Sequence, residues 1–237
     1  MSAYFLLRQT HLARRWGYVP VVLCGLHRIP DHHHGTNTVS QADKEKWDAR
    51  YRDGAYATRN YPSPFLVQAL KMIGTPPSNA RALDLACGAG RNAVHLASCG
   101  YQVNAVDISE TALALGADMA RQAELSGIQW HAHDLDRPLP GTLNGFHLIS
   151  VLRYLNLPII PSLIERLMPG AFLVVEVHLQ SEEAVSGPGG TRFRAAPGEL
   201  RESASNLEVI EYFEGLVNEP DGSRAAVARL IGRRKAD

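Results

Sequence analysis

Short apolar runs alternate with segments of helical period through the middle of the chain. The apolar runs fall at residues 81–85, 102–107, 128–133, 146–152 and 171–178, and each has the length of a strand. Between them, residues 91–98, 109–126 and 158–167 repeat apolar side chains with the period of a helix. Apolar strands that alternate with helices indicate a parallel sheet covered on both faces. We therefore expect an α/β domain.

The pattern changes on both sides of this region. Upstream, residues 40–52 and 65–73 are predicted helices. Downstream, residues 207–213 and 225–233 are predicted strands that flank the turn-forming segment at 218–223, which is typical of an antiparallel hairpin. The complete pattern predicts a Rossmann-like, doubly wound, mostly parallel sheet of seven strands that ends in a C-terminal antiparallel hairpin.

The first 38 residues differ from the rest of the chain. They contain four arginines but no acidic residue before Asp31, and they show no sustained helical period. A disordered extension, translation from an upstream start codon and an organellar transit peptide all fit this composition. The histidines at 32–34 predict no metal site, because consecutive side chains point in different directions. We divide the chain into an N-terminal extension, 1–38, expected to be disordered, and one domain, 39–237.

Composition excludes several classes of protein. The 237 residues include 24 basic and 24 acidic side chains, so no net charge attracts the chain to nucleic acid or to an anionic membrane. The apolar run at 19–26 is too short to cross a bilayer. Three cysteines without a CxxC pair predict neither a disulfide framework nor a zinc site. We expect a cytoplasmic protein, or a mitochondrial one if the extension is a transit peptide, with no metal, nucleic-acid or membrane partner.

The most informative segment joins the first predicted strand to the helix that follows it. Gly88 and Gly90 allow the backbone to turn tightly and a ligand to lie against it. Asp107 ends the second strand, 17 residues after Gly90, where a carboxylate can accept both hydroxyl protons of a ribose. Asp134 follows the third strand. The carboxyl ends of parallel strands meet at one edge, so we expect a single ligand site there, although each acid alone would also serve as a helix cap.

A dinucleotide site is the competing interpretation of this loop. Its fingerprint needs a third glycine, whereas this chain has alanine at position 93. Asp84 lies just before the loop, where its carboxylate would repel a pyrophosphate and attract an amino-bearing ligand. The loop favours an amino-acid nucleoside. A nicotinamide-dependent (NAD) oxidoreductase and a non-catalytic nucleoside-binding module on the same fold stay open as alternatives.

Several segments resemble the motifs of one family. Asp84-Leu-Ala-Cys-Gly-Ala-Gly, Val106-Asp-Ile-Ser and His133-Asp-Leu are similar to successive motifs of class I S-adenosylmethionine-dependent methyltransferases. Lys46-Trp-Asp-Ala-Arg-Tyr-Arg and Gly90-Arg-Asn-Ala-Val-His-Leu-Ala look like the small bacterial branch that includes tellurite-resistance and thiopurine methyltransferases. The resemblance extends from about residue 39 to the C-terminus. Ala86 departs from it, because many members have glycine there.

The resemblance implies a set of residues that bind S-adenosylmethionine. The set is Asp84, Ala86, Gly88, Gly90, Asp107, Ile108, Asp134 and Leu135. Asp84 would anchor the loop or the amino group of the methionine moiety, Asp107 the ribose hydroxyls and Asp134 the adenine amino group. Ile108 and Leu135 would pack beside the adenine, and the two glycines would line the methionine and the ribose.

Methyl transfer from a sulfonium mainly requires an aligned acceptor and the exclusion of water. A soft sulfur, selenium or tellurium nucleophile needs no strong base, whereas a hydroxyl or an amine needs one. Candidate catalytic groups follow the fourth and fifth strands: Arg153, Tyr154 and His178, with Glu176 nearby. Four upstream residues are expected to form either a lid over the cofactor or an ordinary packed helical face: Trp47, Arg50, Tyr51 and Tyr61. We therefore expect a methyltransferase that acts on a small molecule.

Overall fold

The computed structural model describes residues 36–236. Almost all of the predicted extension, 1–38, lies outside the described residues, as do its three consecutive histidines. Helix α1 (Thr36–Arg52) begins four residues before the predicted helix. No helix in the described part of the chain is long and apolar enough to span a membrane.

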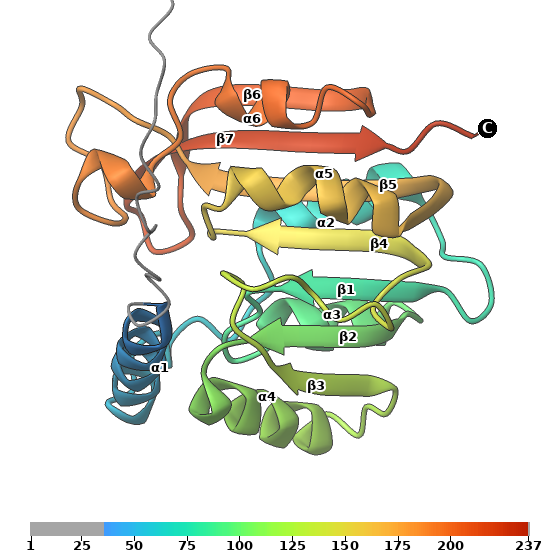
Figure 1. Ribbon diagram of the computed structural model, residues 1–237, viewed down its shortest axis with the longest axis horizontal. Helices are drawn as coiled ribbons and strands as arrows, with labels where there is room; N and C mark the ends of the chain where they lie inside the picture. The colour runs from blue at the N-terminus through green and yellow to red at the C-terminus, as the bar shows by residue number, and fades with distance from the viewer. Residues whose placement is uncertain (1–35, 237) are drawn as a thin grey trace, which may run out of the picture. The chain divides into compact units, whose positions relative to one another are not determined.

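Seven strands form one sheet in the order β3-β2-β1-β4-β5-β7-β6 (Figure 1). The parallel strands are β1 (Arg81–Leu85), β2 (Gln102–Asp107), β3 (Ile128–Ala132), β4 (Phe146–Leu152) and β5 (Leu167–His178). Strands β6 (Glu208–Asn218) and β7 (Arg224–Arg233) form the antiparallel hairpin, and β7 pairs antiparallel with β5. The predicted Rossmann-like sheet is confirmed, with its last strand inside the sheet and β6 at the edge.

Helices cover both faces of the sheet. Helices α2 (Pro64–Ile73), α3 (Arg91–Ser98) and α4 (Glu110–Gln122) contribute apolar side chains to one core cluster. Helices α5 (Ile160–Arg166) and α6 (Glu199–Ser203) contribute to the other. Short 3-10 turns, η2 (Leu157–Ile159) and η3 (Thr191–Phe193), complete the described elements. In Figure 1, α5 lies in front of the sheet, and α2 and α3 lie behind it.

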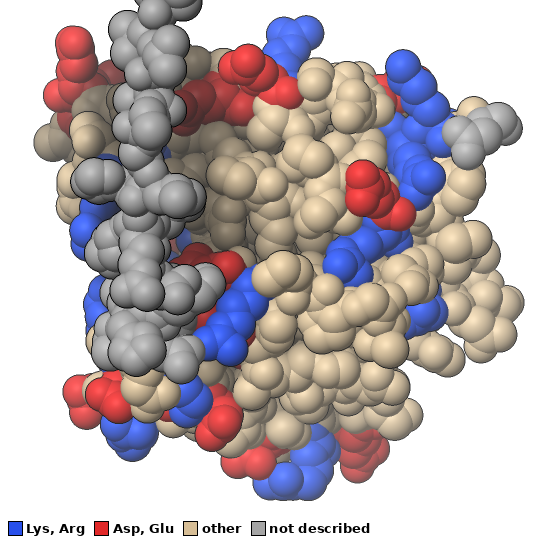
Figure 2. All heavy atoms as spheres, viewed as in Figure 1, with Lys and Arg blue, Asp and Glu red and all other residues tan. Residues whose placement is uncertain are grey.

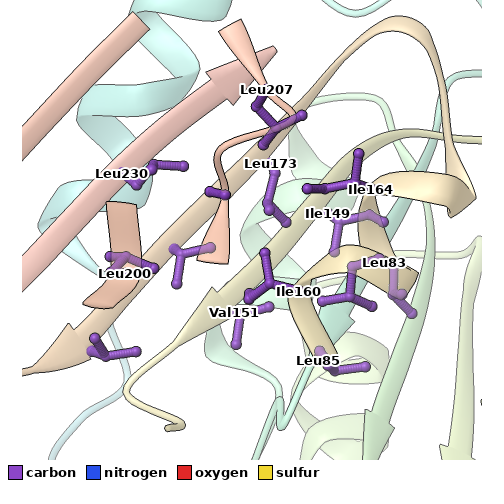
Figure 3. Close-up of a cluster of buried hydrophobic side chains, with 14 of the residues drawn as sticks. Leu83, Leu85, Ile149, Val151, Ile160, Ile164, Leu173, Leu200, Leu207 and Leu230 are labelled. Atoms are coloured by element: carbon purple, nitrogen blue, oxygen red, sulfur yellow. The ribbon is translucent and has the colours of Figure 1, made fainter. Parts of the chain in front are cut away.

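The alternation of side chains along the central strands builds these two cores. Leu83 and Leu85 of β1 join Ile149 and Val151 of β4 in the cluster beneath α5 (Figure 3). Their neighbours Ala82 and Leu148 pack on the opposite face, against α2 and α3. Asp84 and Ser150 interrupt this apolar pattern, although both are buried in the middle of the sheet.

Several further predicted boundaries are wrong. The strand predicted over 207–213 continues as β6 to Asn218, because it pairs with β7 along its length. The helix predicted over 109–126 uses Ser109 as its N-cap and ends at Gln122, because Glu124 adopts a left-handed φ of 55°. The helix predicted over 158–167 divides into η2 and the shorter α5. Strand β5 begins at Leu167 instead of Ala171. Helix α6 was not predicted, because its five residues are too few to show a period.

Candidate functional site

The three predicted acids lie at the carboxyl edge of neighbouring strands. Asp84 lies in β1, Asp107 ends β2 and Asp134 follows β3, and β2 pairs with both β1 and β3. Tyr154, which follows β4, reaches the same place. Burial raises the pKa of its phenol, and the nearby carboxylates of Asp134 and Asp107 raise it further. The chain thus brings an acidic cluster to the edge where ligands of α/β sheets bind.

Asp107 fixes the glycine loop to the end of β2. Its Oδ2 accepts a hydrogen bond from the Gly88 amide at 2.8 Å, and its Oδ1 accepts one from the Ser109 amide at 2.9 Å. The side chain is only 9% exposed, and burial raises its pKa against the opposing effect of these amides. Each carboxylate oxygen can accept a second hydrogen bond, so the ribose role implied by the resemblance is chemically available.

Asp84 is the most unusual group of the site. It is 1% exposed, and its Oδ1 accepts a hydrogen bond from Ser150 Oγ at 2.8 Å. Its buried Oδ2 has no hydrogen-bond partner among the described residues. Burial raises the pKa of this carboxyl to about 7, although the Ser150 hydroxyl and the Arg91 charge act in the opposite direction. A buried oxygen without a donor fits a ligand that brings a cationic amino group to it.

The two glycines of the loop have a packing role that the sequence did not indicate. Gly88 and Gly90 have left-handed φ values of 55° and 74°. A side chain at position 88 would collide with the Tyr51 hydroxyl, and one at position 90 would collide with the Trp130 ring. Gly116 of α4 accommodates the same ring, since a Cβ there would lie 2.6 Å from Trp130 carbons. The loop is therefore packed between α1 and β3.

The remaining predicted cofactor residues line the same edge. Ala86 has a left-handed φ of 51°, which is strained for alanine and is the conformation that glycine adopts freely. Ile108 is half-buried directly after Asp107. Asp134 Oδ1 accepts a hydrogen bond from the Asp136 amide at 3.0 Å, and Leu135 is buried against the core beneath α5.

Arg153 and Glu176 are engaged in a buried ion network. Arg153 Nε lies 2.7 Å from Glu176 Oε1, and Arg153 also pairs with Glu219. Arg229 Nε lies 2.6 Å from the other Glu176 oxygen. Glu176 is 1% exposed. Each oxygen of this carboxylate is therefore paired with an arginine, and neither Glu176 nor Arg153 is presented as an isolated charge.

His178 lies at the end of β5 with its ring against Gly187, where an added side chain would collide with it. Its Nδ1 is buried and has no hydrogen-bond partner among residues 36–236. Burial lowers its pKa to about 3, and the charges of Arg153, Arg194 and Arg59 act in the same direction. The imidazole is therefore neutral near pH 7.

Helix α1 covers the glycine loop, and one of its residues was missed by the sequence analysis. Asp48 is 8% exposed and accepts hydrogen bonds from Ser109 Oγ at 2.7 Å, the Thr111 amide at 3.0 Å and Lys44 Nζ at 3.0 Å. Burial alone would raise its pKa, but these hydrogen bonds outweigh burial and hold the pKa well below its usual range. A single acid in a polar helix gives no pattern from which this contact could be predicted.

Of the four residues predicted as a lid, Tyr51 reaches the loop. Tyr61 takes part through its carbonyl, which accepts a hydrogen bond from Arg91 Nη1 at 3.1 Å. Trp47 and Arg50 instead stack on each other, with the guanidinium 5.0 Å from the ring centroid. Tyr51 and Tyr61 thus contact the loop or the helix after it, whereas Trp47 and Arg50 pack on each other, and a lid over the cofactor stays a prediction.

A recess of about 750 Å³ adjoins the site, between the segment after β4 and helix α6. Tyr154, Leu157 and Pro158 form one side of it, and acidic side chains lie around it: Asp136, Glu199 and Glu202. Figure 2 views the face that carries α5, where charged side chains lie mostly around the margins of an uncharged central area. No group of three or more His, Cys, Asp or Glu side chains in residues 36–236 is arranged to hold a metal ion.

Comparisons with known proteins place the chain in a family. The family model described as "Tellurite resistance protein TehB" matches residues 50–223. A curated relative from Haemophilus influenzae, named "Probable S-adenosyl-L-methionine-dependent methyltransferase TehB", is 27% identical over 181 residues, which are 72% of this chain and 61% of that relative. The ribosomal protein L11 methyltransferase of Syntrophotalea carbinolica is 37% identical over 116 residues, 48% of this chain and 37% of its own length.

Solved structures agree on the fold. TehB from Haemophilus influenzae superposes with a TM-score of 0.61 at 24% identity, over 78% of this chain and 66% of that one. The cyclase SpnF superposes with a TM-score of 0.64 at 16% identity, over 84% of this chain and 97% of that one. Identities this low show the fold alone. Because the family model covers well over half of the chain, the protein belongs to the TehB family of tellurite resistance proteins.

Proposed function

We propose that this chain is an S-adenosylmethionine-dependent methyltransferase that acts on a small molecule. The observation that carries the proposal is the buried, unpartnered oxygen of Asp84 beside a glycine loop tied to Asp107. This pair of carboxylates suits a ligand with an amino group at one end and a ribose at the other. Membership of the TehB family and the name of the Haemophilus influenzae relative support the same reading.

Different residues of the chain would bind different parts of the cofactor. Asp84 Oδ2 would accept a hydrogen bond from the amino group, and Asp107 would accept hydrogen bonds from the ribose hydroxyls. Asp134 would bind the adenine amino group, with Ile108 and Leu135 beside the ring. When bound, the cofactor supplies a methyl group on a positively charged sulfur, which is already an activated leaving group. The protein then has to align the acceptor and exclude water.

The acceptor is proposed to be a small molecule with a sulfur, selenium or tellurium nucleophile. Such an atom needs no strong general base. The candidate bases fit this choice, because both Glu176 oxygens are paired with arginines, and burial lowers the pKa of His178 to about 3, which makes it a weak base. The recess beside Tyr154 offers room for a small acceptor at the same edge of the sheet.

Calorimetric titration with S-adenosylhomocysteine and, separately, with NAD tests the cofactor. We expect micromolar binding of S-adenosylhomocysteine and none of NAD. Asp107→Asn should weaken binding at least about 10-fold, since it removes a charged acceptor from the ribose. Asp118→Asn is the matched control, because Asp118 is an exposed acid of α4 that pairs with Arg121, and its affinity should equal that of the wild type.

Three outcomes would contradict the proposal. Binding of NAD would indicate an oxidoreductase instead. A folded sample that binds neither ligand would exclude both cofactors. Binding of S-adenosylhomocysteine without methyl transfer to any of a panel of small thiols, selenols, selenite and tellurite would indicate a nucleoside-binding module or a different acceptor class.

A further inference from the structure

Ser150 places a hydroxyl group in the middle of an otherwise apolar part of the sheet. It is fully buried, and its neighbours along β4 are Ile149 and Val151. In the register of the parallel pair, Ser150 lies directly opposite Asp84 of β1. A buried hydroxyl in this position would be costly if it had no partner. Its partner is the carboxylate of Asp84.

The hydrogen bond from Ser150 makes the two oxygens of Asp84 unequal. Ser150 Oγ lies 2.8 Å from Oδ1, and its alternative acceptor, the Leu83 carbonyl, is farther away at 3.4 Å. Oδ2 is buried and has no partner among the described residues. Because a carboxylate is planar, a donor that holds Oδ1 also restricts where Oδ2 lies. Ser150 therefore selects one orientation of a group that burial alone would leave free to rotate or to become protonated.

We propose that Ser150 is a positioning residue for cofactor binding, which favours the ionised form of Asp84 and holds its other oxygen available for the amino group of the ligand. This inference rests on the proposed function. Ser150 itself is not expected to touch the ligand. It acts through Asp84, whose other oxygen makes the contact.

The groups around Asp84 explain why the Ser150 hydroxyl has a large effect on its ionisation. Burial opposes its ionisation most strongly, and the hydrogen bond from Ser150 is the largest effect in favour of it. The Arg91 charge and the nearby Ala93 amide, both at the start of α3, also favour the ionised form, and Asp107 at the end of β2 opposes it. The Cys87 thiol faces the same carboxylate, and its own pKa is raised well above the usual value by burial and by Asp84. Because the pKa of Asp84 is about 7, loss of one donor shifts its charge within the physiological range.

The test is the affinity for S-adenosylhomocysteine, measured by calorimetry between pH 6 and pH 8.5, below the range in which the ligand's own amino group deprotonates. In the wild type, affinity should increase as the pH rises through about 7 and then level off. In Ser150→Ala, we expect the midpoint to move upward by about one pH unit and the affinity at pH 7 to fall several-fold, because a hydrogen bond to a charged group is lost. The deficit should shrink toward pH 8.5.

Four further variants separate this role from a merely structural one. Ser150→Thr keeps the hydroxyl and should keep the wild-type pH profile. Asp84→Asn should show a flat profile, and adding Ser150→Ala to it should cause no additional pH dependence. Ser162→Ala removes an exposed hydroxyl of α5 that donates to the Ile159 carbonyl, and it should match the wild type. Thermal melts of each variant confirm folding.

The results distinguish failure of this inference from failure of the proposed function. If the wild type binds and Ser150→Ala has the same pH profile, or loses the same factor of affinity at every pH, the positioning role is wrong while the cofactor site stands. If the folded wild type binds S-adenosylhomocysteine at no pH, the proposed function is overturned and this inference falls with it.

Discussion

At the scale of single residues, folding and ligand binding favour different protonation states of Asp84. The fold buries this carboxylate between Leu83 and Leu85 and supplies one side-chain donor, Ser150. Burial without full hydrogen bonding favours the neutral acid, and this raises its pKa to about 7. A cationic ligand would favour the ionised form. Without the ligand, the buried carboxyl lacks the positive charge that would stabilise its ionised form.

The variant Asp84→Asn should therefore be more stable than the wild type near pH 8, and equally stable near pH 4, when no ligand is bound. The folded pKa of about 7 lies above the ordinary 3.8, so the folded state binds the proton more tightly between these values. The associated stability is complete below about pH 4 and is lost as the pH rises toward 7. The amide cannot ionise, so its advantage over the wild type should grow from near zero at pH 4 to a few kcal/mol at pH 8, with about 4 kcal/mol as the upper limit.

Scanning calorimetry of both proteins from pH 4 to pH 8 measures this difference. Asp118→Asn, on the exposed face of α4, should show no such dependence on pH. A constant difference between Asp84→Asn and the wild type would mean that Asp84 does not titrate in this range.

The residues that the sequence missed share a physical reason. Motif spacing predicted Gly88, Gly90 and Asp107 because turn geometry and strand ends are local properties. The contacts of Tyr51 and Trp130 with the glycines join segments that lie far apart along the chain. No local period encodes such contacts. The same is true of Asp48 and Ser150. Each is a single polar residue, and its role comes from a hydrogen bond to a residue of another element.

At the scale of elements, α1 is a helix held by specific polar contacts. Most of its residues are polar, so burial of an apolar face contributes little to its docking. Asp48 bonds the first turn of α4, and Tyr51 lies one turn further along, over Gly88. Ser109 bonds both Asp48 and Asp107. The position of α1 is thereby linked to the carboxylate proposed to hold the ribose.

Asp48→Ala should release α1 while leaving the sheet intact. It removes the acceptor of three hydrogen bonds, with an expected cost of about 1–3 kcal/mol. Amide hydrogen exchange along residues 41–52 should accelerate about 5- to 150-fold, while β4 and β5 should be unaffected. Glu45→Gln is the control on the same helix, because Glu45 is exposed and accepts a hydrogen bond from the exposed side chain of Gln41. Unchanged exchange in Asp48→Ala, or acceleration throughout the sheet, would contradict an anchoring role.

The bounds of an element were predicted correctly where its own side chains determine where it begins and ends. The bounds of β1, β2, β4 and α3 agree with the prediction because a buried run and a turn residue define each end. β5 begins earlier than predicted because of a distant partner. Gly170 donates to the Arg234 carbonyl at 2.9 Å, and the Arg234 amide donates back to Ala171 at 2.8 Å. This pairing extends the strand through Pro169 and Gly170, which are poor strand formers.

At the scale of the whole domain, one ion network joins the parallel and antiparallel parts of the sheet. Glu176 of β5 bonds Arg153 after β4 and Arg229 of β7, and Arg153 also bonds Glu219 beyond β6. The two negative charges of the glutamates equal the two positive charges of the arginines. The C-terminal hairpin, predicted from alternation and turn residues alone, is in this way connected to the catalytic candidates. That connection depends on pairing and could not be predicted from the sequence.

Glu176→Gln should destabilise the protein by about 1.5–3 kcal/mol, since it removes the charged acceptor of hydrogen bonds from two partly buried arginines. Urea denaturation followed by circular dichroism measures the change. Glu183→Gln breaks an exposed pair with Arg224 and should cost less than about 1 kcal/mol. Adding Arg229→Gln to Glu176→Gln should recover part of the loss. Equal effects of Glu176→Gln and Glu183→Gln would show that the network contributes no more than a surface pair.

The position of β7 has a consequence for protein synthesis. β7 is translated after the other six strands of this sheet, yet it lies between β5 and β6, and within the described residues β6 pairs with β7 alone. A nascent chain therefore carries two open strand edges until β7 has left the ribosome. A premature stop or a proteolytic cut before Arg224 would make that condition permanent, and open edges readily pair with other chains. Truncation of this short segment is thus expected to yield a product that aggregates or is degraded, even though every residue proposed to bind the cofactor is present.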